Sequence, residues 1–205
     1  MKNANPMSLL KRLVASISAA ALLLSMPVAA QIGSPGYQFL EAVRDRDTTK
    51  VNEFLSESTT LINTREITTG QTALLIVVER RDTVWLRYLL QRGADANIGD
   101  RSGVTPLIRA TQLSFVEGVD ALIRRGARVN DGGNSGETPL HLAVQRRDLA
   151  MVRALMAAGA NPDISDNITG LTPRDLAIRD TRASAVLAVL SERPPVPAPR
   201  ASGPN

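Results

Sequence analysis

The stretch Gly136-Glu137-Thr138-Pro139-Leu140-His141-Leu142-Ala143 decides the fold, because related copies of it recur at a nearly constant spacing. Earlier copies begin at Gly70-Gln71-Thr72-Ala73-Leu74 and Gly103-Val104-Thr105-Pro106-Leu107, and a later one begins at Gly170-Leu171-Thr172-Pro173. The opening glycines are separated by 33, 33 and 34 residues. Four copies in one register indicate an internal repeat, in which each unit packs mainly on its neighbours.

Each copy predicts a helix-turn-helix unit, and residues 136–169 show this most clearly. Thr138 can cap the first helix with its hydroxyl, and Pro139 suits the first helical position, where its missing N–H costs nothing. Gly159 is placed to end the second helix in a left-handed conformation. Helices of about ten residues are unstable alone, so the units must stack to fold. Their apolar stripes consist of Leu140, Ala143, Val144, Leu149, Val152, Leu155 and Met156.

The Thr-Pro-Leu-His-x-Ala signature with its 33-residue period resembles the ankyrin-repeat family over residues 37–190. This resemblance implies an all-α ankyrin-repeat solenoid of about five helix-turn-helix repeats with short hairpin-like loops. Aromatic residues make up only 3% of the chain, which suits a core of Leu, Val and Ala spread over stacked repeats. The predicted repeat domain covers residues 37–192, with repeats at about 37–69, 70–102, 103–135, 136–169 and 170–192.

Three of these repeats depart from the pattern. The first lacks Gly-x-Thr-Pro and the last has Arg174 and Asp175 in place of Leu-His, so we interpret both as capping repeats. In the third repeat, Arg109 stands where the family has an apolar residue. Gly118 lies inside its second helix, at a cost of roughly 1 kcal/mol relative to alanine. We therefore expect the third repeat to be the least regular.

Residues 1–30 predict a secretory signal peptide. Lys11-Arg12 ends a basic start, an apolar stretch follows as far as Met26, and Val28-Ala29-Ala30 supplies small residues before a cut after Ala30. This predicts a periplasmic or secreted protein. An uncleaved membrane anchor is the alternative, but the apolar stretch is at the short end of the ~20 residues that a span needs. The chain has no cysteine, so neither a disulfide nor a lipid on cysteine is possible.

Two further segments complete the predicted organisation. Residues 31–36 are predicted to be a short linker, and residues 193–205 a disordered Pro-rich tail. The formal charge of +4 comes partly from residues 1–30, which hold three basic residues and no acidic one. The remainder carries 21 basic and 20 acidic residues, so we expect no nucleic-acid partner.

The residues do not assemble a catalytic or metal site. His141 is the only histidine, and the family resemblance implies a structural role for it, with its ring bonded to nearby backbone and threonine. Asp163 and Asp166 lack the glycine and glutamate of a calcium loop, so we interpret them as solvated turn residues. The glycine-rich segment 132–136 is not followed by Lys-Ser/Thr, as a phosphate loop would be. We therefore predict no enzyme activity, no cofactor and no metal.

In the ankyrin family, partners usually bind the hairpin tips and the exposed side of the first helices, which together form a concave face. Arginine recurs at the corresponding helix positions here, which suggests a partly basic face that pairs with carboxylates of a protein partner. An ordinary solvated face is the alternative. The predicted partner-binding residues are Gln71, Glu79, Arg80, Arg101, Val104, Gln112, Leu113, Glu137, Gln145, Arg146 and Arg179.

These features predict a non-catalytic protein–protein interaction scaffold of the bacterial periplasm. It would bind a protein partner of unknown identity as a monomer, with no membrane contact after signal cleavage. An immunity-type inhibitor of a toxin is one alternative, and the gene neighbourhood would distinguish it, since an immunity protein should sit beside its toxin. An enzyme that uses the concave face is a second alternative, which the lack of catalytic groups disfavours.

Overall fold

A computed structural model of the chain describes residues 33–192. The predicted signal peptide and the Pro-rich tail lie outside the described residues. Within residues 33–192 the chain forms ten α-helices, one 3-10 helix and no strand. No helix in this range is long and apolar enough to span a bilayer.

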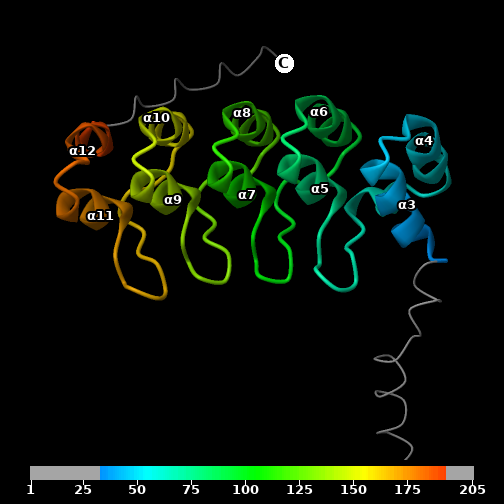
Figure 1. Cartoon of the computed structure of the whole chain (residues 1–205), viewed down its shortest axis with the longest axis horizontal. Coiled ribbons are helices and arrows are strands. Elements are labelled where there is room, and N and C mark those ends of the chain that lie inside the picture. The colour runs from blue at the N-terminus through cyan, green and yellow to red at the C-terminus, as the bar shows by residue number, and fades with distance from the viewer. Residues whose placement is uncertain (1–32, 193–205) are drawn as a thin grey trace, which may run out of the picture.

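The helices form two parallel rows, and the hairpin loops project from the first row on the side away from the second (Figure 1). Neighbouring helices of the first row contact one another along its whole length. The first row comprises α3 (Pro35–Arg44), α5 (Ala73–Glu79), α7 (Pro106–Gln112), α9 (Pro139–Gln145) and α11 (Pro173–Arg179). The second row comprises α4 (Thr48–Glu57), α6 (Thr83–Gln91), α8 (Val116–Arg124), α10 (Leu149–Ala157) and α12 (Ser184–Ser191). The predicted all-α solenoid is confirmed.

The N-terminal caps explain where the helices of the first row begin. In α9 the Thr138 hydroxyl accepts the N–H of His141, and the His141 ring in turn accepts the N–H of Thr138. Such a capping box satisfies two backbone donors that the helix leaves free. The same threonine cap starts α5, α7 and α11, at Thr72, Thr105 and Thr172. In α11, Asp175 takes the place of the histidine in the box.

The turns between the two helices of a repeat contain a left-handed residue. Arg46, Arg81, Ser114 and Arg147 have φ values of 59°, 54°, 49° and 53°. Residues other than glycine rarely adopt a positive φ. The similar φ values therefore show that repeats 1 to 4 use one turn geometry. Gly159, as predicted, follows α10 with a φ of 89°.

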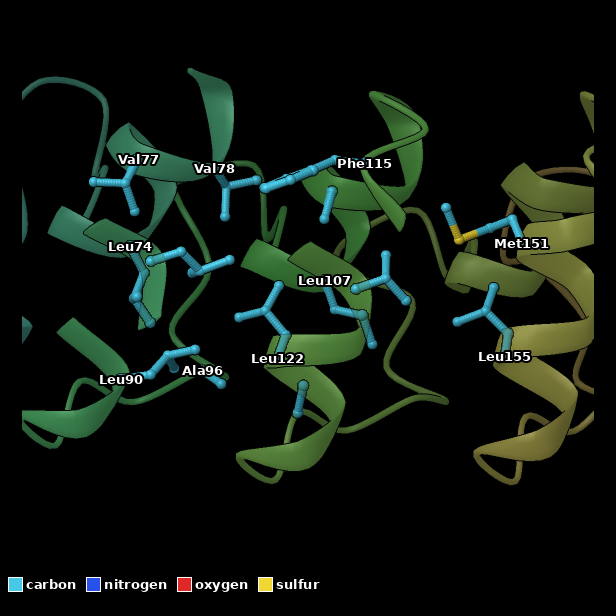
Figure 2. Close-up of a cluster of buried hydrophobic side chains, with 14 of the residues drawn as sticks. Leu74, Val77, Val78, Leu90, Ala96, Leu107, Phe115, Leu122, Met151 and Leu155 are labelled. Carbon is cyan, nitrogen blue, oxygen red and sulfur yellow. The ribbon is translucent and has the colours of Figure 1, made fainter. Parts of the chain in front are cut away.

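The core runs between the two rows as one continuous apolar layer. Figure 2 shows side chains from α5, α6, α7, α8 and α10 filling this layer. Leu74, Leu107 and Leu140 hold the same position in successive first helices, and each is at most 2% exposed. Every repeat therefore needs its neighbour to complete its core, as expected for a solenoid.

The third repeat is as regular as its neighbours, so the expectation that it would be the least regular is wrong. Its α7 and α8 have seven and nine residues, the same lengths as α9 and α10. It differs from repeats 2 and 4 at the start of α8, where Phe115 makes no capping bond and its ring lies over Gly118. A Cβ on Gly118 would lie 2.3 Å from Phe115 Cδ1, so this glycine makes room for the ring.

The start of the solenoid also departs from the prediction. Helix α3 begins at Pro35, inside the segment predicted as a linker (31–36), because Ser34 accepts the N–H of Tyr37 and Pro35 fits the first turn. After α4 the chain makes a 3-10 helix, η1 (Thr59–Asn63), which the sequence analysis did not predict. This helix brings Ile62 into the core and packs Leu61 against it.

Candidate partner-binding surface

The hairpin tips and the outward side of the first helices form one surface, which we call the hairpin face and which corresponds to the predicted concave face. On it, each hairpin places a side chain opposite a helix residue eight positions later. Gln71 Nε2 donates to Glu79 Oε1 at 3.0 Å, and Gln145 Nε2 donates to Glu137 Oε1 at 2.8 Å. The same two positions hold Val104 with Gln112 in repeat 3 and Leu171 with Arg179 in repeat 5. The frame is constant, but the side chains at these two positions change.

Arg109 organises the middle of the hairpin face, although it was not among the predicted site residues. Its Nη1 donates to Gln112 Oε1 at 3.0 Å, and its Nε lies 3.5 Å from Glu79 Oε1. Its Nη2 lies 3.7 Å from Asp100 Oδ2. Arginine where the family has an apolar residue was the signal that could have identified it. The centre of the face is thus a network of opposite charges.

A crevice of about 50 Å³ opens beside this network, between repeats 3 and 4. Its apolar lining includes Val104, Ile108 and Leu142, and its polar lining includes Gln112 and Glu137. Ile108 is buried, whereas Val104 and Leu142 are partly exposed. Because a water occupies about 30 Å³ of liquid, the crevice has room for one small group of a partner.

Arg80 and Arg146, which are predicted to contact a partner, bond to the preceding repeat. Arg80 donates to the carbonyls of Arg44 at 2.6 Å and Val43 at 3.2 Å, at the end of α3. Arg146 donates to the carbonyl of Gln112 at 2.7 Å, at the end of α7. A cation at a helix C-terminus satisfies free carbonyls and the helix dipole. Burial, followed by the nearby charge of Arg46, lowers the pKa of Arg80.

The arginines that follow them reach forward to the next repeat. Arg81 donates to the Ser114 carbonyl at 3.3 Å and lies 5.8 Å from the centre of the Phe115 ring. Arg147 Nη1 lies 2.8 Å from Asp180 Oδ2, and this hydrogen bond lowers the pKa of Asp180. Each Arg-Arg pair therefore ties its own repeat to both neighbours, which gives the recurrent arginines a structural role.

The hairpin tips are joined by a ladder of side chains. Arg101 Nη2 donates to the Ile67 carbonyl, Asn134 Nδ2 donates to the Arg101 carbonyl at 3.3 Å, and Asn167 Nδ2 donates to the Asn134 carbonyl at 3.5 Å. Each hairpin thus holds the carbonyl of the hairpin before it. The side chain of Arg101, another predicted contact residue, belongs to this ladder.

Two family comparisons match the chain over most of its described length. A model described as ankyrin repeats (3 copies) matches residues 39–133, and one described as ankyrin repeats (many copies) matches residues 122–177. The chain belongs to the ankyrin-repeat family. No curated protein matches the chain. Ankyrin repeats are protein–protein interaction modules, and they are generally non-catalytic.

Of the predicted contact residues on this ankyrin surface, two more are placed by the structure. Leu113 is partly exposed and packs against the core. The Arg179 side chain is exposed and makes no hydrogen bond or ion pair within residues 33–192. The structure thus brings Val104, Gln112 and Glu137 together at the crevice and leaves Arg179 apart at the end of the stack.

The single histidine of this ankyrin stack has the geometry of a structural residue. His141 is fully buried, and its Nδ1 accepts the N–H of Thr138 at 3.1 Å. Its Nε2 lies 3.1 Å from the carbonyl of Leu171, which only accepts, so Nε2 carries the proton. The ring therefore links repeat 4 to the hairpin of repeat 5.

The two loop aspartates have separate structural partners. Asp166 was expected to be solvated, but it is buried. Its carboxylate accepts bonds from the Thr169 hydroxyl and from the N–H groups of Thr169 and Ile168. These bonds lower the pKa of Asp166 to about 2. Asp163 pairs with Arg174 Nε at 2.7 Å, and this bond lowers its pKa. No group of three or more potential ligands among the described residues is placed to hold a metal.

Proposed function

We propose that this ankyrin-repeat protein is an exported, non-catalytic scaffold that binds another protein through its hairpin face. The observation that supports the proposal is the contrast between constant and changing positions. The threonine caps and the left-handed turns recur from repeat to repeat, and the Arg-Arg pairs of repeats 2 and 4 serve the same frame. The opposed hairpin and helix positions change from Gln-Glu to Val-Gln, Glu-Gln and Leu-Arg. Side chains that change on a constant frame are suited to recognition of one partner.

The crevice between repeats 3 and 4 supplies the centre of the proposed interface. A small apolar group of the partner would displace water from Val104 and Leu142, while the Gln112 amide nitrogen offers a donor and the Glu137 carboxylate an acceptor beside it. The Arg109 network beside it already pairs its own charges. We therefore expect the interface to depend on shape and hydrogen bonds more than on a net charge.

The interface can be tested with matched surface variants of the exported protein. Partners are captured with affinity-tagged protein and identified by mass spectrometry, and the capture is repeated with Val104→Asp and Val84→Asp. Val104 lies at the crevice, whereas Val84 is 76% exposed on α6 of the other row. Loss of a partner with Val104→Asp alone supports the proposal. Loss with Val84→Asp alone would move the interface to the second row.

The proposed export is tested separately. Cells are fractionated, and the first residue of the protein is determined by N-terminal sequencing. Cleavage after Ala30 predicts Gln31 as the first residue of periplasmic or secreted protein. An intact N-terminus in the membrane fraction would show that the apolar segment is kept as an anchor.

A further inference from the structure

An apolar groove of about 580 Å³ lies at the start of the solenoid, between the first turn of α3 and the hairpin that precedes α5. Its lining includes Pro35, Tyr37, Leu40, Leu61 and Ile67. Ile67 is 53% exposed and is one of the apolar side chains that line the groove. The groove is separate from the hairpin-face crevice, whose lining it does not share.

The hydrogen bonds between later hairpins show what belongs in this place. Two of the three later hairpins are closed by one backbone bond, from Asp100 N to Val104 O and from Asp166 N to Leu171 O. The hairpin between them makes neither this closing bond nor a backbone bond from Asn134 N to the hairpin before it among the described residues. The residue after the closing donor gives its N–H to the preceding hairpin: Arg101 N donates to Thr69 O at 3.0 Å and Asn167 N donates to Ser135 O at 2.9 Å. At these two junctions, an earlier backbone carbonyl meets a later N–H.

The first hairpin has the same donor without the acceptor. It is closed by Glu66 N to Gln71 O, so Ile67 holds the position of Arg101 and Asn167. The N–H of Ile67 has no hydrogen-bond partner among residues 33–192. The open donor and the apolar groove therefore lie at the one place in the described hairpin row where a preceding hairpin is missing.

The exported chain is too short before α3 to supply that hairpin. If the signal is cleaved after Ala30, only Gln31 and Ile32 precede Gly33, and two extended residues reach at most about 7 Å. The closed hairpins span up to six residues, as in 66–71 and 166–171. The groove is continuous with the hairpin-to-hairpin contacts, so an extended backbone is the ligand that fits it.

We propose that this groove binds an extended, uncharged segment of a partner protein with aliphatic side chains at alternate positions. A backbone carbonyl of the segment accepts the Ile67 N–H, as Thr69 accepts that of Arg101, and the side chains on one face enter the groove. This site is additional to the hairpin face. It does not depend on binding there, although it does depend on removal of the signal.

The test uses the exported protein, isotope-labelled, with acetyl-Thr-Val-Thr-Leu-Thr-Gly-amide as the probe. Nitrogen–proton correlation spectra should show that the Ile67 amide shifts on titration to millimolar peptide. Ile67→Asp should weaken binding at least tenfold. Ile168→Asp is the matched control, because Ile168 is the same type of residue, more exposed at 75%, in the last hairpin. It should leave the affinity unchanged, and circular dichroism checks that both variants fold.

Three results would overturn the proposal. The first is the absence of a shift at Ile67 with millimolar peptide. The second is equal binding of acetyl-Thr-Ser-Thr-Ser-Thr-Gly-amide, which lacks the aliphatic groups. The third is binding that appears only after residues 1–32 have been deleted, because the chain's own leading segment would then be the occupant.

Discussion

The two rows of helices begin in different ways. All four first helices from α5 onward begin with the same threonine cap. The second helices in the same repeats have Asp82, Phe115, Asp148 and Ala183 at the N-cap, and only the aspartates make a capping bond. The first row also carries the hairpins and meets the next repeat there, as the bond from His141 to Leu171 shows. The comparison teaches that the row that forms the hairpin face has a fixed frame, whereas the other row tolerates different solutions.

The largest expected effect comes from removing the Phe115 ring, which packs over Gly118 at the start of α8. Phe115 is 2% exposed and fills the space above Gly118, so Phe115→Ala should lower the free energy of unfolding by about 3–5 kcal/mol. Chemical denaturation measures the loss. A change below about 1 kcal/mol would mean that the ring does not carry the packing of this repeat.

A double variant sharpens the same comparison. Repeat 4 has Asp148 and Met151 at the positions of Phe115 and Gly118. Gly118→Met alone should clash with the ring, and Phe115→Asp alone should leave a cavity. The two together reproduce the solution of repeat 4, so the double variant should be more stable than the sum of the single changes predicts. Simple additivity would contradict the idea that the two solutions are interchangeable.

In the first row, His141→Ala should cost about 2–4 kcal/mol, because it leaves the Thr138 N–H and the Leu171 carbonyl without partners in a buried site. Asp175→Ala is the control: Asp175 completes the same capping box in α11, where no repeat follows in the described chain. Its smaller loss should be measurable in the same denaturation series. Equal losses would show that the bond between repeats adds nothing to the cap.

The aspartate cap of the second row should contribute less. Asp148 accepts the N–H of Met151 at 3.0 Å, and Asp148→Ala should lower the free energy of unfolding by about 1 kcal/mol. Asp120→Ala removes an exposed ion pair with Arg124 on α8 and serves as the control, with an expected change of about 0.5 kcal/mol or less. A cap effect as small as the control would contradict the assigned role.

The smallest expected effect is a change in the pH dependence of unfolding that appears only at acidic pH. The bonds from Thr169 and Ile168 lower the pKa of Asp166 to about 2, below the usual value near 3.9. A lowered pKa in the folded state gives stability that is present above pH ~4 and is lost as the pH falls towards ~2. Asp166→Asn should therefore flatten the pH dependence of unfolding in that range. An unchanged slope between pH ~4 and ~2 would contradict the hydrogen bonds assigned to this carboxylate.

The repeats, the caps and the structural histidine were predictable because they rest on local chemistry that the sequence displays. The roles of the arginines were not, since Arg80 and Arg81 lie side by side in sequence yet bond to different repeats. The sequence allowed an estimate of what Gly118 costs inside a helix, but it did not predict that Phe115 lies against Gly118. That contact depends on the direction in which the Phe115 side chain points. The hairpin ladder likewise joins residues more than thirty positions apart.

Hydrogen exchange tests the central claim most directly, because it reports which row a partner covers. Residues 31–205 are measured alone and bound to the partner that they capture. The account predicts added protection at the hairpin tips, in peptides containing Gln71, Val104 and Glu137, with little change along α6, α8 and α10. Protection confined to those second-row helices, with the hairpin tips unchanged, would contradict the account.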